Sequence, residues 1–170
     1  EHLKQAIQNL GDVIVKPMDG MGGNSIFKTS KDDKNLNVLL ETVTQNNTRT
    51  TMVQKYVKEI SAGDKRILMI NGEPVPFALA RIPSEHDFRG NLAKGGTGKG
   101  IPLSEYDYKI CRLVGPLLKQ MGIVFAGIDV IGEFLTEVNV TSPTCIRELD
   151  TLFGLNIAGQ LFDYLESSSK

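Results

Sequence analysis

The 170-residue sequence has no tryptophan, two cysteines and two histidines, and these shortages limit the chemistry that it can support. Cys111 and Cys145 lie far apart and form no CxxC motif. Two free thiols in a reducing compartment are therefore the favoured interpretation, with a disulfide or a shared metal as the alternative. His2 and His86 have no ligand spacing to each other or to the cysteines, which argues against a structural zinc site.

Long hydrophobic runs and an excess of charge of one sign are also missing. No apolar run approaches the roughly 18 residues of a membrane helix. The 19 basic residues are balanced by 20 acidic ones, whereas nucleic-acid binders usually carry a basic excess. We therefore expect a cytoplasmic protein with no membrane and no nucleic acid among its partners. Its length is sufficient to bury a hydrophobic core without disulfides.

The apolar periodicity predicts a mixture of helices and strands. Asn71-Gly72 between two strand-like runs is the strongest hairpin signal. Ser104 is the expected N-cap of a helix that Gly122 ends. Helices are expected at 1–10, 34–46, 105–121 and from 157 onward, and strands at 13–17, 25–28, 50–57, 65–70, 74–82, 123–131 and 135–141. This mixture of hairpins and helices predicts an α+β fold. The apolar face of the helix after Ser104 is expected to comprise Ile110, Leu113, Val114, Leu117, Leu118 and Met121.

Glycine is abundant, with 17 residues, and the first cluster follows a strand that ends in a cation. The stretch Lys16-Pro17-Met18-Asp19-Gly20-Met21-Gly22-Gly23-Asn24-Ser25 joins that strand to the next. Glycines allow backbone N–H groups to converge on an anion. The stretch is not a Walker A loop, because a strand and not a helix follows. A phosphate-covering turn and a plain hairpin loop both remain open on these residues alone.

The second glycine cluster lies in residues 83–102, which have no apolar periodicity. Gly95 to Gly100 fails as a P-loop, because Gly100 stands where Ser or Thr must ligate magnesium. We therefore predict a mobile lid over 83–102 that excludes water from a reactive intermediate. Arg89 and Asn91 near its middle are candidates for contact with a substrate phosphate.

A third candidate is the hairpin that carries Asp129, Glu137 and Asn139. A two-residue turn would pair Asp129 with Thr136, whereas a three-residue turn pairs Asp129 with Glu137 and separates apolar from polar faces. We predict the three-residue turn. The result is a set of hard oxygen ligands on one face, as magnesium prefers, with a solvated polar face as the alternative.

Four arginines complete the candidates: Arg66, Arg81, Arg89 and Arg147. Arginine binds carboxylate and phosphate bidentately, although each of these residues also fits an ordinary surface ion pair. The segment Thr141 to Ile146 offers hydroxyl and N–H groups in front of a short helix, which is a plausible seat for a carboxylate.

Together these stretches resemble the prokaryotic glutathione synthetase family of the ATP-grasp superfamily. The resemblance covers nearly the whole chain, and its most specific part is Thr136-Glu137-Val138-Asn139-Val140-Thr141-Ser142-Pro143-Thr144-Cys145-Ile146-Arg147-Glu148. It implies an ATP-grasp fold, in which two α+β lobes with mostly antiparallel sheets clasp ATP. Residues 1–57 would form the small lobe, incomplete at its N-terminus, and 58–170 the large lobe with the metal hairpin and the lid.

The resemblance also implies roles for individual residues. The nucleotide would be bound by Lys16, Gly20, Met21, Gly22, Gly23, Ser25, Gln54, Lys55, Tyr56, Val57 and Asp64. Asp129, Glu137 and Asn139 would hold Mg²⁺, with Mn²⁺ possible. Arg66, Arg89, Arg81 and Asn91 would act around the transferred phosphoryl group or the intermediate, and Ser142 and Thr144 would orient a substrate.

The implied reaction joins γ-glutamylcysteine to glycine through an acyl phosphate and releases ADP and phosphate. The family's N-terminal substrate domain is absent from this chain, so we expect the isolated chain to be inactive, and we expect the full-length protein to form a homo-oligomer, either dimer or tetramer. Two alternatives remain: another ATP-grasp carboxylate–amine ligase, or a non-catalytic nucleotide-binding module.

Overall fold

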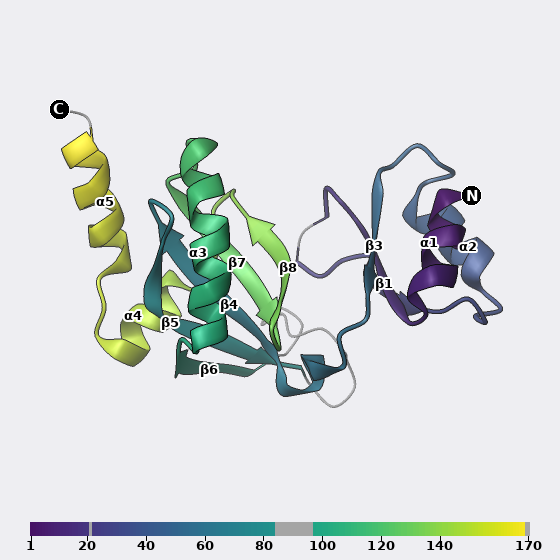
Figure 1. Ribbon diagram of the computed structural model, residues 1–170, viewed down its shortest axis with the longest axis horizontal. Coiled ribbons are helices and arrows are strands. Elements are labelled where there is room, and N and C mark those ends of the chain that lie inside the picture. Colours follow the sequence, from purple (N-terminus) through teal and green to yellow (C-terminus); the bar gives the residue numbers. More distant parts are fainter. Residues whose placement is uncertain (21, 84–96, 169–170) are drawn as a thin grey trace. The chain divides into compact units, whose positions relative to one another are not determined.

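The computed structural model describes residues 1–20, 22–83 and 97–168 and divides the chain into two compact units, Glu1–Lys58 and Glu59–Lys170 (Figure 1). Each unit combines helices with one antiparallel sheet, so the α+β class predicted from the sequence is confirmed. None of the helices in the described residues is long and apolar enough to cross a membrane.

The first unit is a three-stranded sheet with helices packed on one face. Its elements are α1 (His2–Leu10), β1 (Val13–Pro17), β2 (Phe27–Thr29), α2 (Leu36–Val43) and β3 (Thr51–Lys55), and the strand order is β2-β1-β3. Side chains alternate along β1, so that Val13 and Val15 are buried with Ile7 of α1 and Val43 of α2. Lys16 consequently lies on the face of the sheet opposite to this core.

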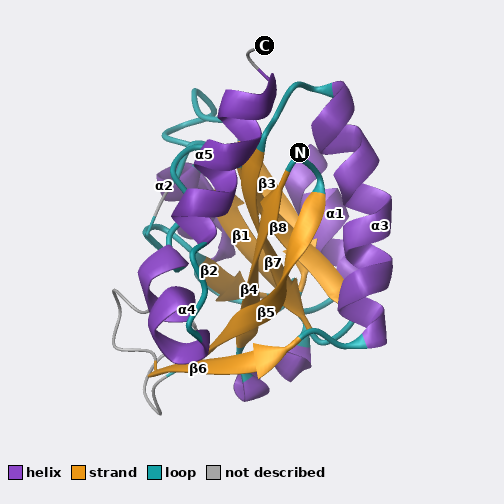
Figure 2. Ribbon diagram, turned by 90° about the vertical axis from the view of Figure 1, so that its left-hand side faces the viewer, coloured by secondary structure: helices purple, strands orange, loops and turns teal. Residues whose placement is uncertain are grey.

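The second unit is a five-stranded antiparallel sheet with helices on both faces (Figure 2). Its elements are the 3₁₀ helix η1 (Lys58–Ala62), β4 (Asp64–Ile70), β5 (Glu73–Ile82), β6 (Thr97–Pro102), α3 (Glu105–Gln120), β7 (Phe125–Ile131), β8 (Phe134–Asn139), α4 (Ile146–Phe153) and α5 (Ile157–Ser168). The strand order is β6-β5-β4-β7-β8.

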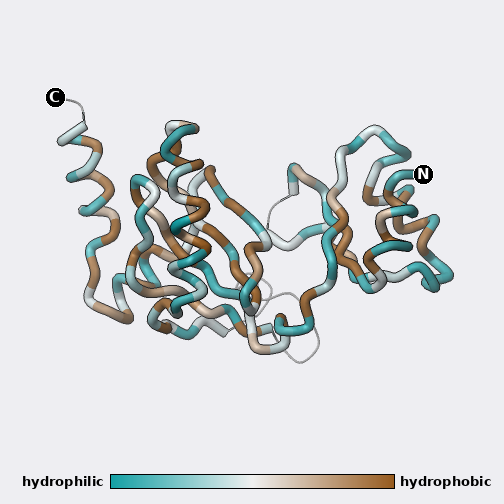
Figure 3. Tube along the Cα trace, in the orientation of Figure 1, coloured by the Kyte–Doolittle hydropathy of each residue, from teal (hydrophilic) through white to brown (hydrophobic). Residues whose placement is uncertain are grey.

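Alternation along β4 divides the second unit into two cores. Ile67 and Met69 pack with α3 on one face, and Leu68 packs with α4 and α5 on the other. Figure 3 shows the resulting brown, hydrophobic stretches along the strands. Arg66 shares the face of Leu68, beyond the edge of the apolar cluster. One face of the sheet is therefore apolar under α4 and charged further along.

Two turns in the second unit were predicted, one correctly. Asn71 and Gly72 have positive φ angles of 48° and 71°, as a type I′ turn between β4 and β5 requires. The β7–β8 register is also as predicted, because Asp129 pairs with Glu137. The predicted three-residue turn is wrong, however. Ile131 pairs with Phe134, which leaves a two-residue turn, and the extra residue is absorbed as a bulge at Thr136.

Part of the predicted lid is a strand. Residues 97–102 form β6 and pair with β5, and the remainder of the predicted loop, 84–96, lies outside the described residues. The glycines suggested a loop, but Gly100 has a packing reason: a Cβ there would lie 2.5 Å from the ring of Phe153, which stacks on Phe77. Glycine at this edge therefore admits the end of α4.

Helix α3 begins as predicted but buries a different stripe. Ser104 and Asp107 form a reciprocal capping box at its N-terminus. Leu113, Leu117 and Met121, expected on the apolar face, are exposed. The buried stripe consists of Asp107, Cys111, Val114, Gly115 and Leu118. The difference arises because α3 approaches the β4–β5 turn through the small residue Gly115.

We predict that Gly115→Ala destabilises the protein. Glycine to alanine inside a helix ordinarily stabilises by roughly 0.5–1 kcal/mol. Here the new Cβ would lie 2.2 Å from the carbonyl oxygen of Gly72, so overpacking should prevail with a net loss of about 1–3 kcal/mol. Urea unfolding measures the change, with exposed Lys109→Ala on the same helix as the control. Equal or higher stability of Gly115→Ala would contradict the close approach.

Candidate active site

A group of charged side chains lies on the α4 face of the second unit's sheet. Strand pairing creates it, because Arg66 is opposite Asp129, Asp129 is opposite Glu137, and Asp64 is opposite Arg81. Paired residues point to the same face of a sheet. Five predicted site residues, contributed by four strands, are thus brought together.

Asp129 is the centre of this group. Arg66 donates to both of its carboxylate oxygens, from Nε to Oδ1 and from Nη2 to Oδ2 at 2.9 Å. Arg81 approaches Oδ2 with Nη2, also at 2.9 Å. Arg66, Arg81 and Asp129 are each only 6% exposed, so the surface ion pair considered as an alternative is wrong for these two arginines. These guanidinium groups are fixed within the protein.

Burial and charge act on these groups in opposite directions. Burial would raise the pKa of Asp129, but the hydrogen bonds from Arg66 and the charge of Arg81 hold it below its ordinary 3.8. For Asp64, burial prevails over its contact with Arg81 and raises the pKa. Burial would lower the pKa of Arg81, but the carboxylates of Asp129 and Asp64 raise it. Arg81 thus stays protonated, and Asp129 stays ionised at neutral pH.

The β7–β8 hairpin supplies the oxygen donors that were predicted to hold a metal. Asn139 pairs with Gly127 and donates from Nδ2 to its carbonyl oxygen at 3.3 Å, while Glu137 is exposed. The described residues contain no group of three or more His, Cys, Asp or Glu side chains that could hold a metal ion. Two carboxylates and one amide oxygen fit the preference of Mg²⁺ for hard ligands, with the remaining positions left to phosphate and water.

The segment between β8 and α4 lies against the arginines. Thr144 accepts a hydrogen bond from Nη1 of Arg66 at 3.4 Å. Ser142 has a positive φ of 50° and is exposed. Gly127 allows this close approach, because a Cβ there would lie 2.7 Å from Pro143 and 3.0 Å from Arg66 Cδ. Of the two hydroxyls predicted to orient a substrate, that of Thr144 therefore lies beside the charged group.

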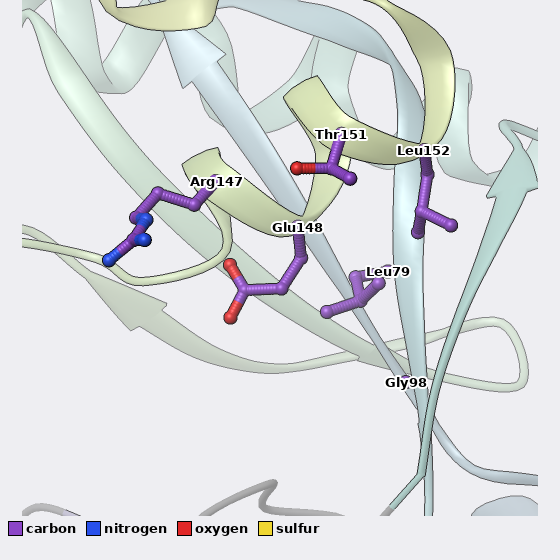
Figure 4. Close-up of a pocket in the computed structure, with 6 residues that line it drawn as sticks. All are labelled: Leu79, Gly98, Arg147, Glu148, Thr151 and Leu152. Carbon is purple, nitrogen blue, oxygen red and sulfur yellow. The ribbon is translucent and has the colours of Figure 1, made fainter.

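A pocket of about 530 Å³ lies on the same face of the sheet and was missed by the sequence reasoning. It is lined by Leu79, Gly98, Arg147, Glu148, Thr151 and Leu152. Figure 4 shows Glu148 and Leu152 extending from α4 towards the strand of Leu79, with Arg147 directed away from it. Leu79 is two residues before Arg81 on β5, and Gly98 is opposite Arg81 on β6, so the pocket adjoins the charged group. The neighbouring charged residues Arg147 and Glu148 were the signal in the sequence that could have indicated this pocket.

The start of the glycine-rich turn of the first unit is attached to the residues just before β3. Met18 N donates to Thr50 O at 3.1 Å, and Asp19 accepts from Arg49 Nε at 2.6 Å. Arg49 thereby neutralises the one acidic side chain of the turn, which favours an anion nearby. Sequence reasoning missed this arginine. Of the remaining predicted turn residues, Gly20, Gly22 and Ser25 are exposed, Gly23 is half-buried, and Met21 lies outside the described residues.

The segment predicted to lie along adenine is held to the chain around β1, partly through the β1–β3 ladder. Tyr56 N donates to Asp12 O at 2.9 Å, so this amide holds the segment to the chain before β1. Lys28 lies over the Tyr56 ring, with Nζ 4.0 Å from the centroid, a cation–π contact that sequence reasoning missed. Gln54 is opposite Ile14, and Lys16 lies two residues further along β1 on the same face of the sheet. Lys55 is exposed and Val57 half-buried.

Two of the predicted cationic and polar site residues, Arg89 and Asn91, lie outside the described residues. Both cysteines are buried free thiols, as the favoured interpretation of the sequence expected. Burial raises the pKa of Cys111 to about 11, and it also raises the pKa of Cys145. Neither thiol is prepared for nucleophilic chemistry at neutral pH.

Solved structures with the same fold define the class of protein. The ATP-grasp ligase PsnB, in a complex with the precursor peptide PsnA2 and AMPPNP, matches with a TM-score of 0.66 and 18% identity over 98% of this chain and 49% of its own. D-alanine--D-alanine ligase from Bacillus anthracis matches with a TM-score of 0.64 and 19% identity, over 97% of this chain and 57% of its own. The fold is therefore the ATP-grasp fold, as the resemblance predicted.

Sequence comparison gives the family. The family model "Prokaryotic glutathione synthetase, ATP-grasp domain" matches residues 1–154, and the chain belongs to this family. Glutathione synthetase of Xanthomonas campestris is 56% identical over 98% of this chain and 53% of its own length, and that of Yersinia pestis is 52% identical over 98% and 52%. The chain thus spans about half the length of the curated relatives that it matches.

We predict that Asp129→Asn lowers the free energy of unfolding by about 3 kcal/mol at pH 7, because it removes the carboxylate that the buried Arg66 contacts and one of the two that Arg81 contacts. The pKa of Asp129 is lower in the folded protein than in the unfolded protein. The ionised carboxylate therefore stabilises the fold at pH values above its unfolded-state pKa, and this stabilisation is lost as the pH falls through its folded-state pKa. The difference between wild type and variant should therefore narrow below about pH 4.

Urea unfolding in EDTA at pH 7 and at pH 3 measures both effects without a metal contribution. Exposed Asp163→Asn on α5 is the control for loss of a carboxylate. A constant difference across this pH range would argue against an ionised Asp129 as the partner of the arginines.

Proposed function

We propose that the protein joins γ-glutamylcysteine to glycine at the expense of ATP and releases ADP and phosphate. The family match over residues 1–154 carries this proposal. A carboxylate oxygen of γ-glutamylcysteine attacks the γ-phosphorus, and the bond from that phosphorus to the bridging oxygen of ADP breaks. The glycine amine then attacks the acyl phosphate carbonyl carbon, phosphate departs, and the amine loses a proton.

The charged group of the second unit suits this chemistry. Both steps need positive charge near a phosphoryl or acyl phosphate group, and neither needs a nucleophilic side chain. Arg66 and Arg81 are buried and preorganised, so their guanidinium groups need little reorganisation during the reaction. We assign them to stabilise the phosphoryl group and the intermediate, together with Arg89 and Asn91. Ser142 and Thr144 would orient the carboxylate substrate.

We assign Asp129, Glu137 and Asn139 to hold Mg²⁺, with Mn²⁺ as a substitute. Bound there, the cation would neutralise charge on the nucleotide phosphates. The protein's own contribution is to set the three oxygens by strand pairing and to balance Asp129 with Arg66 and Arg81. Where such a donor is exposed, as Glu137 is, its loss should therefore affect the reaction more than the stability of the fold.

We assign nucleotide binding to the first unit and the start of the second. The cation of Lys16 and the glycine-rich turn Gly20–Gly23 with Ser25 would contact phosphates. Gln54, Lys55 and Val57 would lie along adenine through backbone groups and an apolar wall, with Tyr56 held by Asp12 and Lys28. Asp64 at the start of β4 completes the set.

The remaining parts of the proposal concern the whole protein. We propose a cytoplasmic enzyme whose N-terminal substrate domain lies outside this chain and which forms a dimer or tetramer. In this scheme 1–57 and 58–170 are the small and large ATP-grasp lobes. The 170-residue chain alone would then bind nucleotide weakly and would not turn over.

The proposal predicts ADP release only when both acceptor substrates are present. A coupled ADP assay on the natural-length protein with Mg²⁺, γ-glutamylcysteine and glycine, omitting each in turn, measures this dependence. Glycine and γ-glutamylcysteine should each be needed for full turnover, and glutathione should form in a one-to-one ratio with ADP. Binding of ATP with no ADP release would instead indicate a nucleotide-binding module. Turnover with a different amine acceptor would indicate another carboxylate–amine ligase.

We predict that Glu137→Gln lowers kcat by about 100-fold or more, because it removes a charged metal donor while preserving size and the exposed position. Glu133→Gln is the matched control, since Glu133 is an exposed glutamate at the tip of the same hairpin. The control should retain wild-type activity. Near-normal ADP release by Glu137→Gln would overturn the metal assignment but not the ligase activity.

A further inference from the structure

Arg81 is fixed between two carboxylates, and the second of these belongs to Asp64. Arg81 Nε donates to Asp64 Oδ1 at 3.0 Å, and Nη2 contacts Oδ2 of the same carboxylate. Nη2 also lies 2.9 Å from Asp129 Oδ2. Both oxygens of Asp64 are therefore engaged by one guanidinium, which is the geometry that holds an arginine plane in a single orientation.

The backbone fixes the same pair. Asp64 and Arg81 are direct partners in the β4–β5 ladder, so the two side chains leave the sheet side by side. Gly63, immediately before Asp64, has a φ of 100°, and a Cβ there would lie 2.9 Å from the carbonyl oxygen of Arg81. On the other side of β5, Arg81 is opposite Gly98, which has no side chain that could hold the guanidinium from that direction. Asp64 is thus the main lateral support of Arg81.

The charge balance gives this support a consequence. Two guanidinium groups, those of Arg66 and Arg81, are matched by the carboxylates of Asp64 and Asp129. Without the charge of Asp64, Arg81 would keep Asp129 as its ion-pair partner among the described residues and would turn towards it. A positioned cation whose charged atoms move by about 1 Å loses much of its effect on a reacting group.

We propose that Asp64 is a positioning residue that orients Arg81 for the reaction. This inference rests on the proposed function, in which Arg81 serves the phosphoryl group or the intermediate. It adds to the assignment of Asp64 as a nucleotide contact, and the two roles predict different kinetics. A nucleotide contact changes the KM for ATP, whereas a residue that orients Arg81 changes kcat.

The test compares Asp64→Asn with wild type in the natural-length protein. Asparagine keeps the size but loses the charge and one acceptor, so kcat should fall by about 10- to 100-fold while the KM for ATP changes by less than about threefold. Asp64→Glu keeps the charge and should recover part of the loss. Lys65→Met is the matched control, because it removes the Lys65–Asp107 ion pair from the opposite face of the same strand. It should leave kcat unchanged.

A double-mutant cycle with Arg81→Lys separates this role from a structural one. If Asp64 acts through Arg81, Asp64→Asn should lower kcat by less than about threefold further in the Arg81→Lys background. Full additivity of the two losses would overturn the proposal, as would a rise in the KM for ATP with kcat unchanged. If Asp64→Asn does not fold, Asp64→Glu carries the same expectation with a smaller amplitude.

The outcomes for the two proposals remain distinct. A wild-type protein that forms no glutathione overturns the proposed function, and this inference with it. A wild-type protein that forms glutathione, with an Asp64→Asn variant that matches it and Lys65→Met, overturns the role of Asp64 alone.

Discussion

The site of the second unit depends on one interaction, the buried contact of Asp129 with Arg66 and Arg81. A buried charge is costly unless it is paired and hydrogen-bonded, and here three nearly buried charged groups satisfy one another. Removing Asp129 would take from Arg66 the carboxylate that it contacts and would leave Arg81 with Asp64. Strand pairing makes the arrangement possible, because β4, β5 and β7 are adjacent in the sheet and place their charged side chains on one face.

The apolar half of the same face explains why the charges occur where they do. Leu68 and Leu79 lie under α4 and α5, so the sheet there is covered and dry. Arg66 and Arg81 are each two residues from one of these leucines, on the same face and past the edge of the helices. A charged group at this boundary is shielded by the protein around it. The pocket that Glu148 and Leu152 line lies along this edge.

The sequence predicted most of the fold because its local signals agree with the tertiary structure. The Asn71-Gly72 turn, the Ser104 cap and the strand at 13–17 were each predicted from a few neighbouring residues, and each is present. The β7–β8 register was obtained for a sound reason, the separation of polar from apolar faces, although the turn was wrong. A bulge at Thr136 restores the register after a shorter turn, and no pattern in the sequence marks it, because a bulge changes only which backbone groups pair.

The wrong predictions for β6 and for the buried stripe of α3 have a shared physical cause. Close packing requires a glycine where a segment distant in the sequence approaches, and the neighbouring residues do not show that segment. Gly98 and Gly100 suggested a loop, yet Gly100 belongs to an edge strand that faces the Phe153 ring. Gly115 altered the buried stripe of α3 because Gly72 approaches it. The charged group was predicted as residues but not as contacts, and for a different reason.

A spacing of two residues places Arg66 and Asp64 on one face, but which carboxylate holds which arginine depends on three strands that are distant in the sequence. The proposed reaction rests on the family match, and the strand register explains how Arg66 and Arg81 become fixed cations. Phosphoryl transfer requires charge in a set position more than it requires a reactive side chain. In the proposed function, the β4–β5 and β4–β7 ladders would meet this requirement through backbone geometry, because they set the positions of Arg66 and Arg81.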